Sequence, residues 1–81
     1  MTNVLIYSTP SCGYCKMAKE FFKENNIKYE EKDVAENEIA AQEMMDKSQQ
    51  MGVPVIIIEK EGKENMVVGF DKKKLTELLE L

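Results

Sequence analysis

Residues 8–16 of this chain read Ser8-Thr9-Pro10-Ser11-Cys12-Gly13-Tyr14-Cys15-Lys16. This stretch contains both cysteines of the sequence. An apolar, strand-like run (residues 3–7) comes directly before it, and a helix-like run (residues 16–22) follows it. A C-x-x-C pair between a strand and a helix is typical of a redox motif at a helix N-terminus. We therefore interpret the rest of the chain as the scaffold around this turn.

The length of 81 residues predicts one domain, residues 1–81. A chain of this size buries only about 60% of the surface that its unfolded form exposes, so its core is small. Small secreted domains compensate with several disulfides. The single C-x-x-C pair closes too short a loop to stabilise a fold in that way. The pair therefore indicates a chemical role.

The charge of the chain excludes several functions. The net charge is −4, with 15 acidic and 11 basic residues, and every basic residue is a lysine. A nucleic-acid partner is not expected, because such proteins normally carry a basic excess and use arginine for base contacts. The sequence has no histidine, so Ser–His and Cys–His hydrolysis are excluded as well. Thiol–disulfide exchange needs only a thiolate.

The sequence predicts a cytoplasmic protein that does not enter a membrane. Residues 1–3 lead straight into the first strand, without the charged and apolar regions of a signal peptide. The longest apolar run, residues 53–58, is far shorter than the roughly 20 residues that span a bilayer.

Hydrophobic periodicity predicts seven elements in the order β-α-β-α-β-β-α. This order predicts an α/β fold with one four-stranded mixed sheet and helices on both faces. The first two strands should be parallel, joined by a right-handed crossover, and the last two should form a hairpin around residues 59–64. Ser11 is the expected cap of the first helix and Asp71 that of the last. The strands are expected over residues 4–7, 27–34 (near an edge), 53–58 and 66–68, and the helices over about 12–24, 36–50 and 72–79.

Apolar side chains at helical spacing predict the buried faces of the helices. Methionine fills irregular gaps in cores, and Met17, Met44 and Met45 are assigned that role, whereas Met51 is a candidate substrate contact. The triplet of lysines at residues 72–74 is either a solvated face or a set of charges that steers an acidic partner or glutathione. The predicted stripes are Met17, Ala18, Phe21 and Phe22, then Ile39, Ala40 and Met44 or Met45, and finally Leu75, Leu78 and Leu79.

Cys12 is the expected nucleophile. At a helix N-terminus its sulfur faces unpaired N–H groups and the positive end of the helix dipole, which both favour a thiolate. Lys16 adds positive charge nearby. Cys15, one turn further along, is the expected resolving thiol. The alternative of a structural zinc site fails, because zinc takes four ligands and this chain offers two cysteines and no histidine.

Three segments taken together resemble the glutaredoxin family of the thioredoxin fold. The resemblance covers nearly the whole chain and is greatest for the short bacterial glutaredoxin-like proteins with a CGYC motif. It implies a thiol–disulfide oxidoreductase, dependent on glutathione or on a reductase, that reduces protein or glutathione mixed disulfides through a Cys12–Cys15 dithiol. The three segments are Thr9-Pro10-Ser11-Cys12-Gly13-Tyr14-Cys15, Gly52-Val53-Pro54 and Gly69-Phe70-Asp71.

The resemblance also implies a substrate groove. The Val53–Pro54 bond is expected in cis, which costs little for X-Pro, with the backbone of Val53 pairing with substrate. Tyr14 and Phe70 should line the groove beside Gly69, although Tyr14 could equally cover the helix end. N–H groups at Asp71 should receive the γ-glutamyl carboxylate of glutathione. The expected partners are glutathione as co-substrate, disulfide-containing proteins and a flavoprotein reductase, with no permanently bound cofactor and a monomeric chain.

Several positions depart from the family pattern. Val68 stands where a first glycine is usual, Lys72 replaces a second acidic residue, and Thr9 replaces a lysine. The glutathione site therefore looks incomplete, and Gln50, Lys47 or Lys72 are candidates to meet its glycine carboxylate. Gly13 replaces the usual proline of the turn. Two alternatives follow from the resemblance: a [2Fe-2S] cluster-binding glutaredoxin, and a thioredoxin-like electron donor to ribonucleotide reductase.

Overall fold

A computed structural model describes residues 2–50 and 52–81. Met51, the candidate substrate contact, lies outside the described residues. The elements follow the predicted order, and all four strands belong to one sheet with the strand order β2-β1-β3-β4. The elements are β1 (Thr2–Ser8), α1 (Gly13–Glu24), β2 (Glu30–Asp33), α2 (Glu38–Ser48), β3 (Val55–Lys60), β4 (Lys63–Val68) and α3 (Lys72–Leu78).

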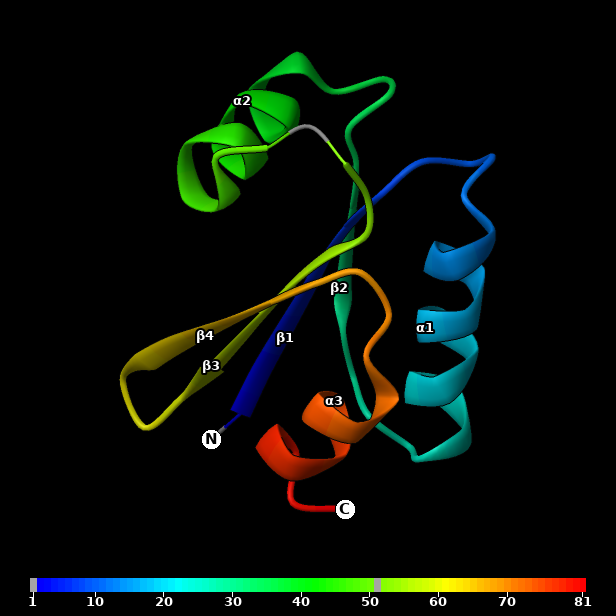
Figure 1. Ribbon diagram of the computed structural model, residues 1–81, viewed down its shortest axis with the longest axis vertical. Coiled ribbons are helices and arrows are strands. Elements are labelled where there is room, and N and C mark those ends of the chain that lie inside the picture. The colour runs from blue at the N-terminus through cyan, green and yellow to red at the C-terminus, as the bar shows by residue number, and fades with distance from the viewer. Residues whose placement is uncertain (1, 51) are drawn as a thin grey trace.

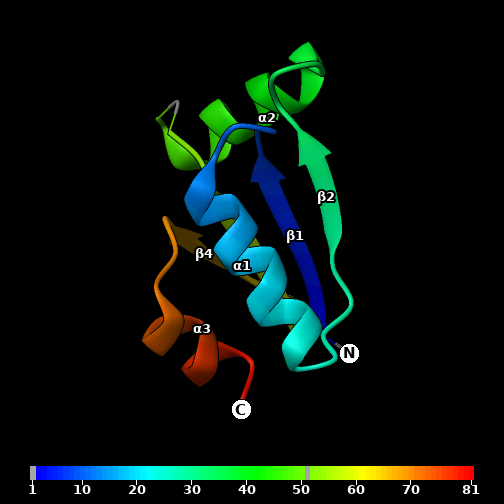
Figure 2. The ribbon, with the colours of Figure 1, turned by 90° about the vertical axis from the view of Figure 1, so that its right-hand side faces the viewer.

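The sheet is mixed, as the sequence predicts. β1 pairs in parallel with β2 and antiparallel with β3, and β3 pairs antiparallel with β4. α1 and α3 cover one face and α2 covers the other (Figures 1 and 2). This is the thioredoxin fold expected from the resemblance.

The register of the sheet brings three distant segments to one end of the molecule. Tyr7 pairs with Val55, so the end of β1 lies beside the start of β3. Val55 also pairs with Val68, so the end of β4 lies there too. The turn after β1, the loop before β3 and the loop after β4 must therefore meet, because antiparallel pairing places these strand ends side by side.

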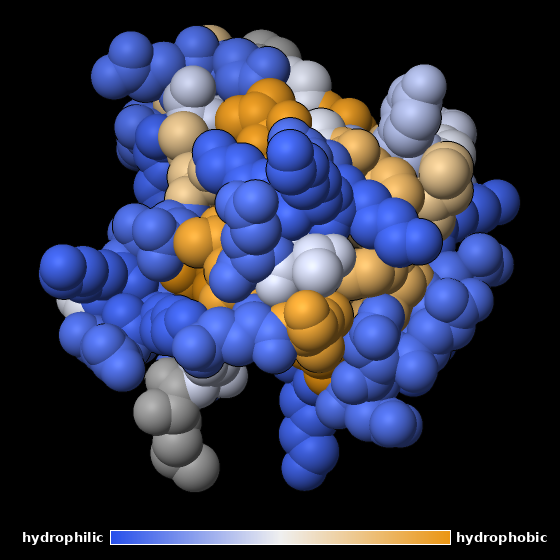
Figure 3. All heavy atoms as spheres, turned by 60° about the horizontal axis from the view of Figure 1, so that its bottom comes forward, coloured by the Kyte–Doolittle hydropathy of each residue, from blue (hydrophilic) through white to orange (hydrophobic). Residues whose placement is uncertain are grey.

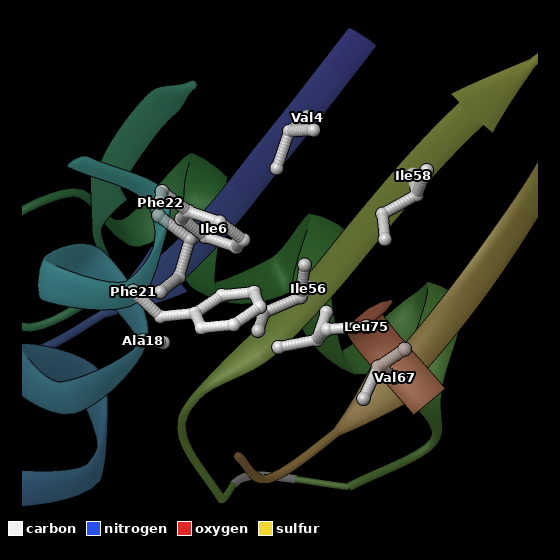
Figure 4. Packing of buried hydrophobic residues seen from close by; sticks show 9 residues of the cluster. All are labelled: Val4, Ile6, Ala18, Phe21, Phe22, Ile56, Ile58, Val67 and Leu75. Carbon is white, nitrogen blue, oxygen red and sulfur yellow. The ribbon is translucent and has the colours of Figure 1, made fainter. Parts of the chain in front are cut away.

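The main core lies between the sheet and the helices α1 and α3 (Figure 4). Phe22, Ile56 and Leu75 are among its fully buried members. Phe21 and Phe22 lie edge to face, with ring centroids 6.1 Å apart, a preferred aromatic geometry. A smaller core on the opposite face consists of Tyr7, Ala40, Met44, Val55 and Ile57.

Three of the predicted core side chains are exposed instead. Met17 is 48% exposed, Ile39 76% and Met45 41%. Each lies on the outer side of its helix, because the inner side is occupied by Cys15, Ala18 and Phe22 in α1 and by Ala40 and Met44 in α2. The assignment of Met17, Ile39 and Met45 to the core was therefore wrong, and that of Met44 is confirmed.

Several predicted boundaries shift for local reasons. Cys12, not Ser11, caps α1. Asn37 caps α2 through its side chain, so this helix begins at Glu38 rather than 36. The second strand pairs only over Glu30–Asp33, and Ile27 and Tyr29 pack against the core before it begins.

The hairpin is tighter than predicted, which lengthens its strands. Only Glu61 and Gly62 form the turn, with φ of 53° and 80°, as a two-residue hairpin turn of the type with both central φ positive requires. β4 therefore begins at Lys63 rather than residue 66. β3 begins at Val55 rather than Val53, because Val53–Pro54 forms the loop before it.

Replacing the buried Ile56 by alanine should lower the free energy of unfolding by about 2–5 kcal/mol, because it removes methylene groups and leaves a cavity. The same replacement at the exposed Ile39 should change it by less than about 0.5 kcal/mol. Urea titration of both variants measures the two effects. Equal losses would contradict the placement of Ile39 outside the core.

Candidate active site

Cys12 is built into the beginning of α1. Its backbone is extended (φ −84°, ψ 113°), and its sulfur accepts a hydrogen bond from the backbone N–H of Cys15, 3.1 Å away. No acidic residue lies in the first turn of this helix. The positive end of the helix dipole therefore faces the Cys12 sulfur without a competing carboxylate.

The two cysteines are free thiols in very different surroundings. Cys12 is half-buried, whereas Cys15 is fully buried. Burial, and secondly a hydrogen bond with the Cys12 side chain, raise the pKa of the Cys15 thiol to about 12. The positive charge of Lys19, one turn along the helix, acts in the opposite direction but is a smaller effect. Cys15 is therefore a protonated thiol at neutral pH, and Cys12 is the one that solvent and substrate can reach.

The loop before β3 lies against Cys12. The Cys12 thiol points to the backbone oxygen of Val53 at 3.8 Å. The Val53–Pro54 bond is cis, as the resemblance implies. The Pro54 carbonyl oxygen accepts a hydrogen bond from the N–H of Gly69 at 2.8 Å. These contacts join the cysteine turn, the Val53–Pro54 step and the loop after β4 into one site.

The remaining expected residues surround this site less closely. Tyr14 is 64% exposed in the first turn of α1. Phe70 packs edge-on against Phe21, with ring centroids 6.0 Å apart, and remains partly exposed. The Asp71 carboxylate accepts a hydrogen bond from the Lys74 N–H at 3.1 Å, which confirms it as the cap of α3.

The residues proposed for the glutathione carboxylate differ in availability. The ammonium group of Lys47 pairs with Glu64 at 2.9 Å, on the side of the sheet that α2 covers. The Gln50 amide donates to the carbonyl oxygen of Gly52 at 3.2 Å, in the loop that leads to Val53. Lys72 is exposed at the start of α3, which leaves its charge accessible.

A polar cluster beside the site was missed by the sequence analysis. Ser8 is buried at the end of β1, and its hydroxyl donates to Glu31 at 2.7 Å. Lys19 pairs with the same carboxylate oxygen at 2.7 Å. Lys19, and secondly the Ser8 hydroxyl, hold the pKa of Glu31 below its usual range, and Glu31 raises the pKa of Lys19. The cluster ties β1, β2 and α1 together. Its only signal in the sequence was a serine at the end of an apolar strand.

Comparison with known proteins identifies the family. The sequence profile described as "Glutaredoxin" matches residues 4–62. The chain belongs to the glutaredoxin family. It is 42% identical, over 77 residues, to a glutaredoxin-like protein in the rubredoxin operon of Clostridium pasteurianum, with 95% of this chain and 97% of that one covered. It is 41% identical over 73 residues to a prophage-derived thioredoxin-like protein of Bacillus subtilis, covering 86% of this chain and 85% of the other.

Solved structures agree with this assignment. A thioredoxin-like protein superposes with a TM-score of 0.83 at 32% identity, covering 99% of this chain and 97% of that one. A glutaredoxin of Archaeoglobus fulgidus superposes with a TM-score of 0.80 at 27% identity, covering 98% and 87%. The chain is thus a glutaredoxin- or thioredoxin-like redox protein.

The described part of the chain has neither a metal-binding cluster nor a membrane-spanning helix. Over residues 2–50 and 52–81, no group of three or more cysteine, histidine or acidic side chains has an arrangement that could hold a metal ion. Within the same ranges, no helix has the length and apolar character needed to cross a membrane.

The raised pKa of Cys15 predicts a loss of stability in alkaline solution. In the unfolded chain this thiol ionises near its usual pKa of about 8.5, whereas in the folded protein it stays protonated up to about 12. The contribution of Cys15 to stability is therefore fully present below about pH 8.5 and is lost as the pH rises toward 12.

Urea unfolding between pH 8 and 10.5, with a phosphine reductant present, measures this loss. Unfolding free energy should fall more steeply with pH for the unaltered protein than for Cys15→Ser, with a difference in slope of up to about 1.4 kcal/mol per pH unit. Tyr7, whose pKa burial also raises, is present in both proteins, so its effect cancels. Parallel curves would show that Cys15 ionises as easily folded as unfolded.

Proposed function

We propose that this protein is a thiol–disulfide oxidoreductase that uses Cys12 as nucleophile and Cys15 as resolving thiol. The observation that carries this proposal is the pairing of an accessible Cys12 at the N-cap of α1 with a buried Cys15 whose N–H reaches the Cys12 sulfur. Only the first thiol is open to a substrate. The second thiol, Cys15, is buried one helical turn further along α1.

The reaction proceeds by two exchanges. The Cys12 thiolate attacks one sulfur of the substrate disulfide, which forms a mixed disulfide and releases the other sulfur as a thiolate that takes up a proton. Cys15 then loses its proton and attacks the Cys12 sulfur, which forms the Cys12–Cys15 disulfide and releases the second substrate thiol. Two electrons have then passed from the protein dithiol to the substrate.

The loop before β3 supports substrate binding in this scheme. In the reduced protein the backbone oxygen of Val53 lies 3.8 Å from the Cys12 sulfur. A substrate segment bonded to Cys12 would lie along the backbone of Val53, with Gly69 and Phe70 on the adjoining loop. The proposed substrates are mixed disulfides of proteins or of glutathione, and the proposed setting is the cytoplasm, where thiols are kept reduced.

The two cysteines should fail in different ways when replaced. Cys12→Ser should abolish disulfide reduction, because it removes the attacking sulfur. Cys15→Ser should retain the first exchange and accumulate a mixed disulfide on Cys12. Mass spectrometry after exposure to oxidised glutathione measures the adduct: one glutathione per chain for Cys15→Ser and none for Cys12→Ser. Adducts on Cys12→Ser in place of Cys15→Ser would reverse the two roles.

The electron donor is proposed to be glutathione. We expect turnover in a coupled assay with NADPH, glutathione reductase, glutathione and a small mixed disulfide, measured as NADPH consumption with and without the protein. Absence of turnover, from protein whose disulfide dithiothreitol reduces normally, would move the donor to a flavoprotein reductase. It would then favour a thioredoxin-like donor, such as one for ribonucleotide reductase.

The alternative function, binding of a [2Fe-2S] cluster, requires more thiolate ligands than one chain offers at this site. A [2Fe-2S] cluster takes four thiolate ligands, and each chain offers one accessible thiol, Cys12, because Cys15 is buried. Two chains and two glutathione molecules would be needed. Visible absorption of the protein after reconstitution with iron, sulfide and glutathione distinguishes this alternative from the dithiol reductant.

A further inference from the structure

A shallow groove of about 260 Å³ runs along the exposed side of α1. One wall is α1 and the other is the loop between β4 and α3. Its floor is the edge-to-face pair of Phe21 and Phe70. Met17, nearly half of whose surface is exposed, lies at the end nearer the cysteines. The lining residues are Met17, Glu20, Phe21, Glu24, Phe70 and Lys72.

The groove is linked to the reacting thiol through residues that neighbour it in the chain. Phe70 directly follows Gly69, whose N–H donates a hydrogen bond to the Pro54 carbonyl oxygen. The residue before Pro54 is Val53, whose backbone oxygen contacts the Cys12 sulfur. A substrate that lies along Val53 therefore leads toward Phe70. Figure 3, which looks toward the α3 end, shows hydrophobic residues among hydrophilic ones at this end of the molecule.

The charges along the groove are arranged at a cost to the helices. Glu20 and Glu24 are exposed and four residues apart on α1, a spacing at which like charges repel and weaken a helix. Lys72, the lysine that lines the groove, lies in the first turn of α3, where the helix dipole disfavours positive charge.

The ion pairs of the protein lie elsewhere. Within residues 2–50 and 52–81, none of the four salt bridges includes Glu20, Glu24 or the lysines at the start of α3. The groove is thus lined by two acidic side chains of α1 and by Lys72 of α3, with apolar side chains between them, and these charges can meet those of a partner.

We propose that this groove binds the polypeptide of a disulfide-bonded protein substrate, with an apolar side chain between Met17 and Phe70 and a basic side chain against Glu20 and Glu24. The inference rests on the proposed function and specifies its substrate class. Complementary charge supports this occupant, since charges at the rim of an interface select partners and raise association rates.

The helix rise fixes the spacing that such a substrate needs. Met17 is five residues and Glu24 twelve residues beyond Cys12, which at 1.5 Å per residue is about 7.5 Å and 18 Å along the axis. An extended peptide advances about 3.3 Å per residue. The apolar side chain should therefore lie two or three residues from the substrate cysteine, and the basic one about five.

Two peptides test the proposal by single-turnover kinetics with the reduced protein, which needs no electron donor. Each carries its cysteine as a mixed disulfide with thionitrobenzoate, a leucine three residues away, and either lysine or glutamate five residues away. Each peptide is made in two versions, with the leucine and the charged residue on either the N-terminal or the C-terminal side of the cysteine. Release of thionitrobenzoate, followed by stopped-flow absorbance, gives the second-order rate constant. The ratio of the rate constants for the lysine and the glutamate peptide is independent of any change in the reactivity of the Cys12 thiol.

The unaltered protein should react about three to ten times faster with the lysine peptide than with the glutamate peptide, in at least one chain direction. Glu20→Lys combined with Glu24→Lys should abolish or reverse this preference. A control pair, Glu59→Lys and Glu61→Lys at the β3–β4 hairpin, changes net charge equally and should keep it.

Three outcomes would overturn the proposal. Equal rates with the two peptides in both directions would exclude charge selection by the groove. An equal loss of preference in the control pair would reduce the effect to net charge alone. No reaction with either peptide or with a small disulfide would refute the proposed function, and the docking proposal with it.

Discussion

The hydrogen bond from the Cys15 N–H to the Cys12 sulfur caps the beginning of α1 and also fixes the reacting atom of the site. Helix caps are normally oxygen atoms of serine, threonine, aspartate or asparagine. Here a sulfur occupies that position, so the atom that satisfies the helix terminus is also the exposed thiol. Any change in the bonding of Cys12 acts directly on the first turn of α1 and on its neighbour, Cys15.

This arrangement depends on a rigid platform beneath the helix. Ala18 and Phe22 pack α1 against the buried strands β1 and β3, and the Lys19–Glu31–Ser8 cluster joins the helix to β1 and to the edge strand β2. The cost of burying Ser8 is offset, because its hydroxyl donates to a carboxylate. Together these contacts fix the position of Cys12 relative to Val53 on the neighbouring loop.

Two groups of charged residues have different consequences. The four ion pairs among the described residues connect elements around the sheet and the C-terminus, where exposed pairs each contribute little to stability. The charges beside the groove have no such partner in the described chain and face each other across apolar side chains. The first group is explained by the fold itself, and the second lines the groove in which we propose that a substrate polypeptide binds.

Local patterns in the sequence determined the order of elements, the position of the cysteines at a strand–helix boundary and the cap at Asp71, because periodicity and capping act over a few residues. The resemblance added the cis bond at Val53–Pro54. Tertiary structure alone decided which side chains the helices bury. Met17 and Ile39 are as apolar as their buried neighbours, but the docking of each helix on the sheet leaves them exposed. The meeting of Cys12, Val53 and Gly69 was likewise decided by strand register, since only the pairing of Val55 with Tyr7 and Val68 brings those loops to one edge.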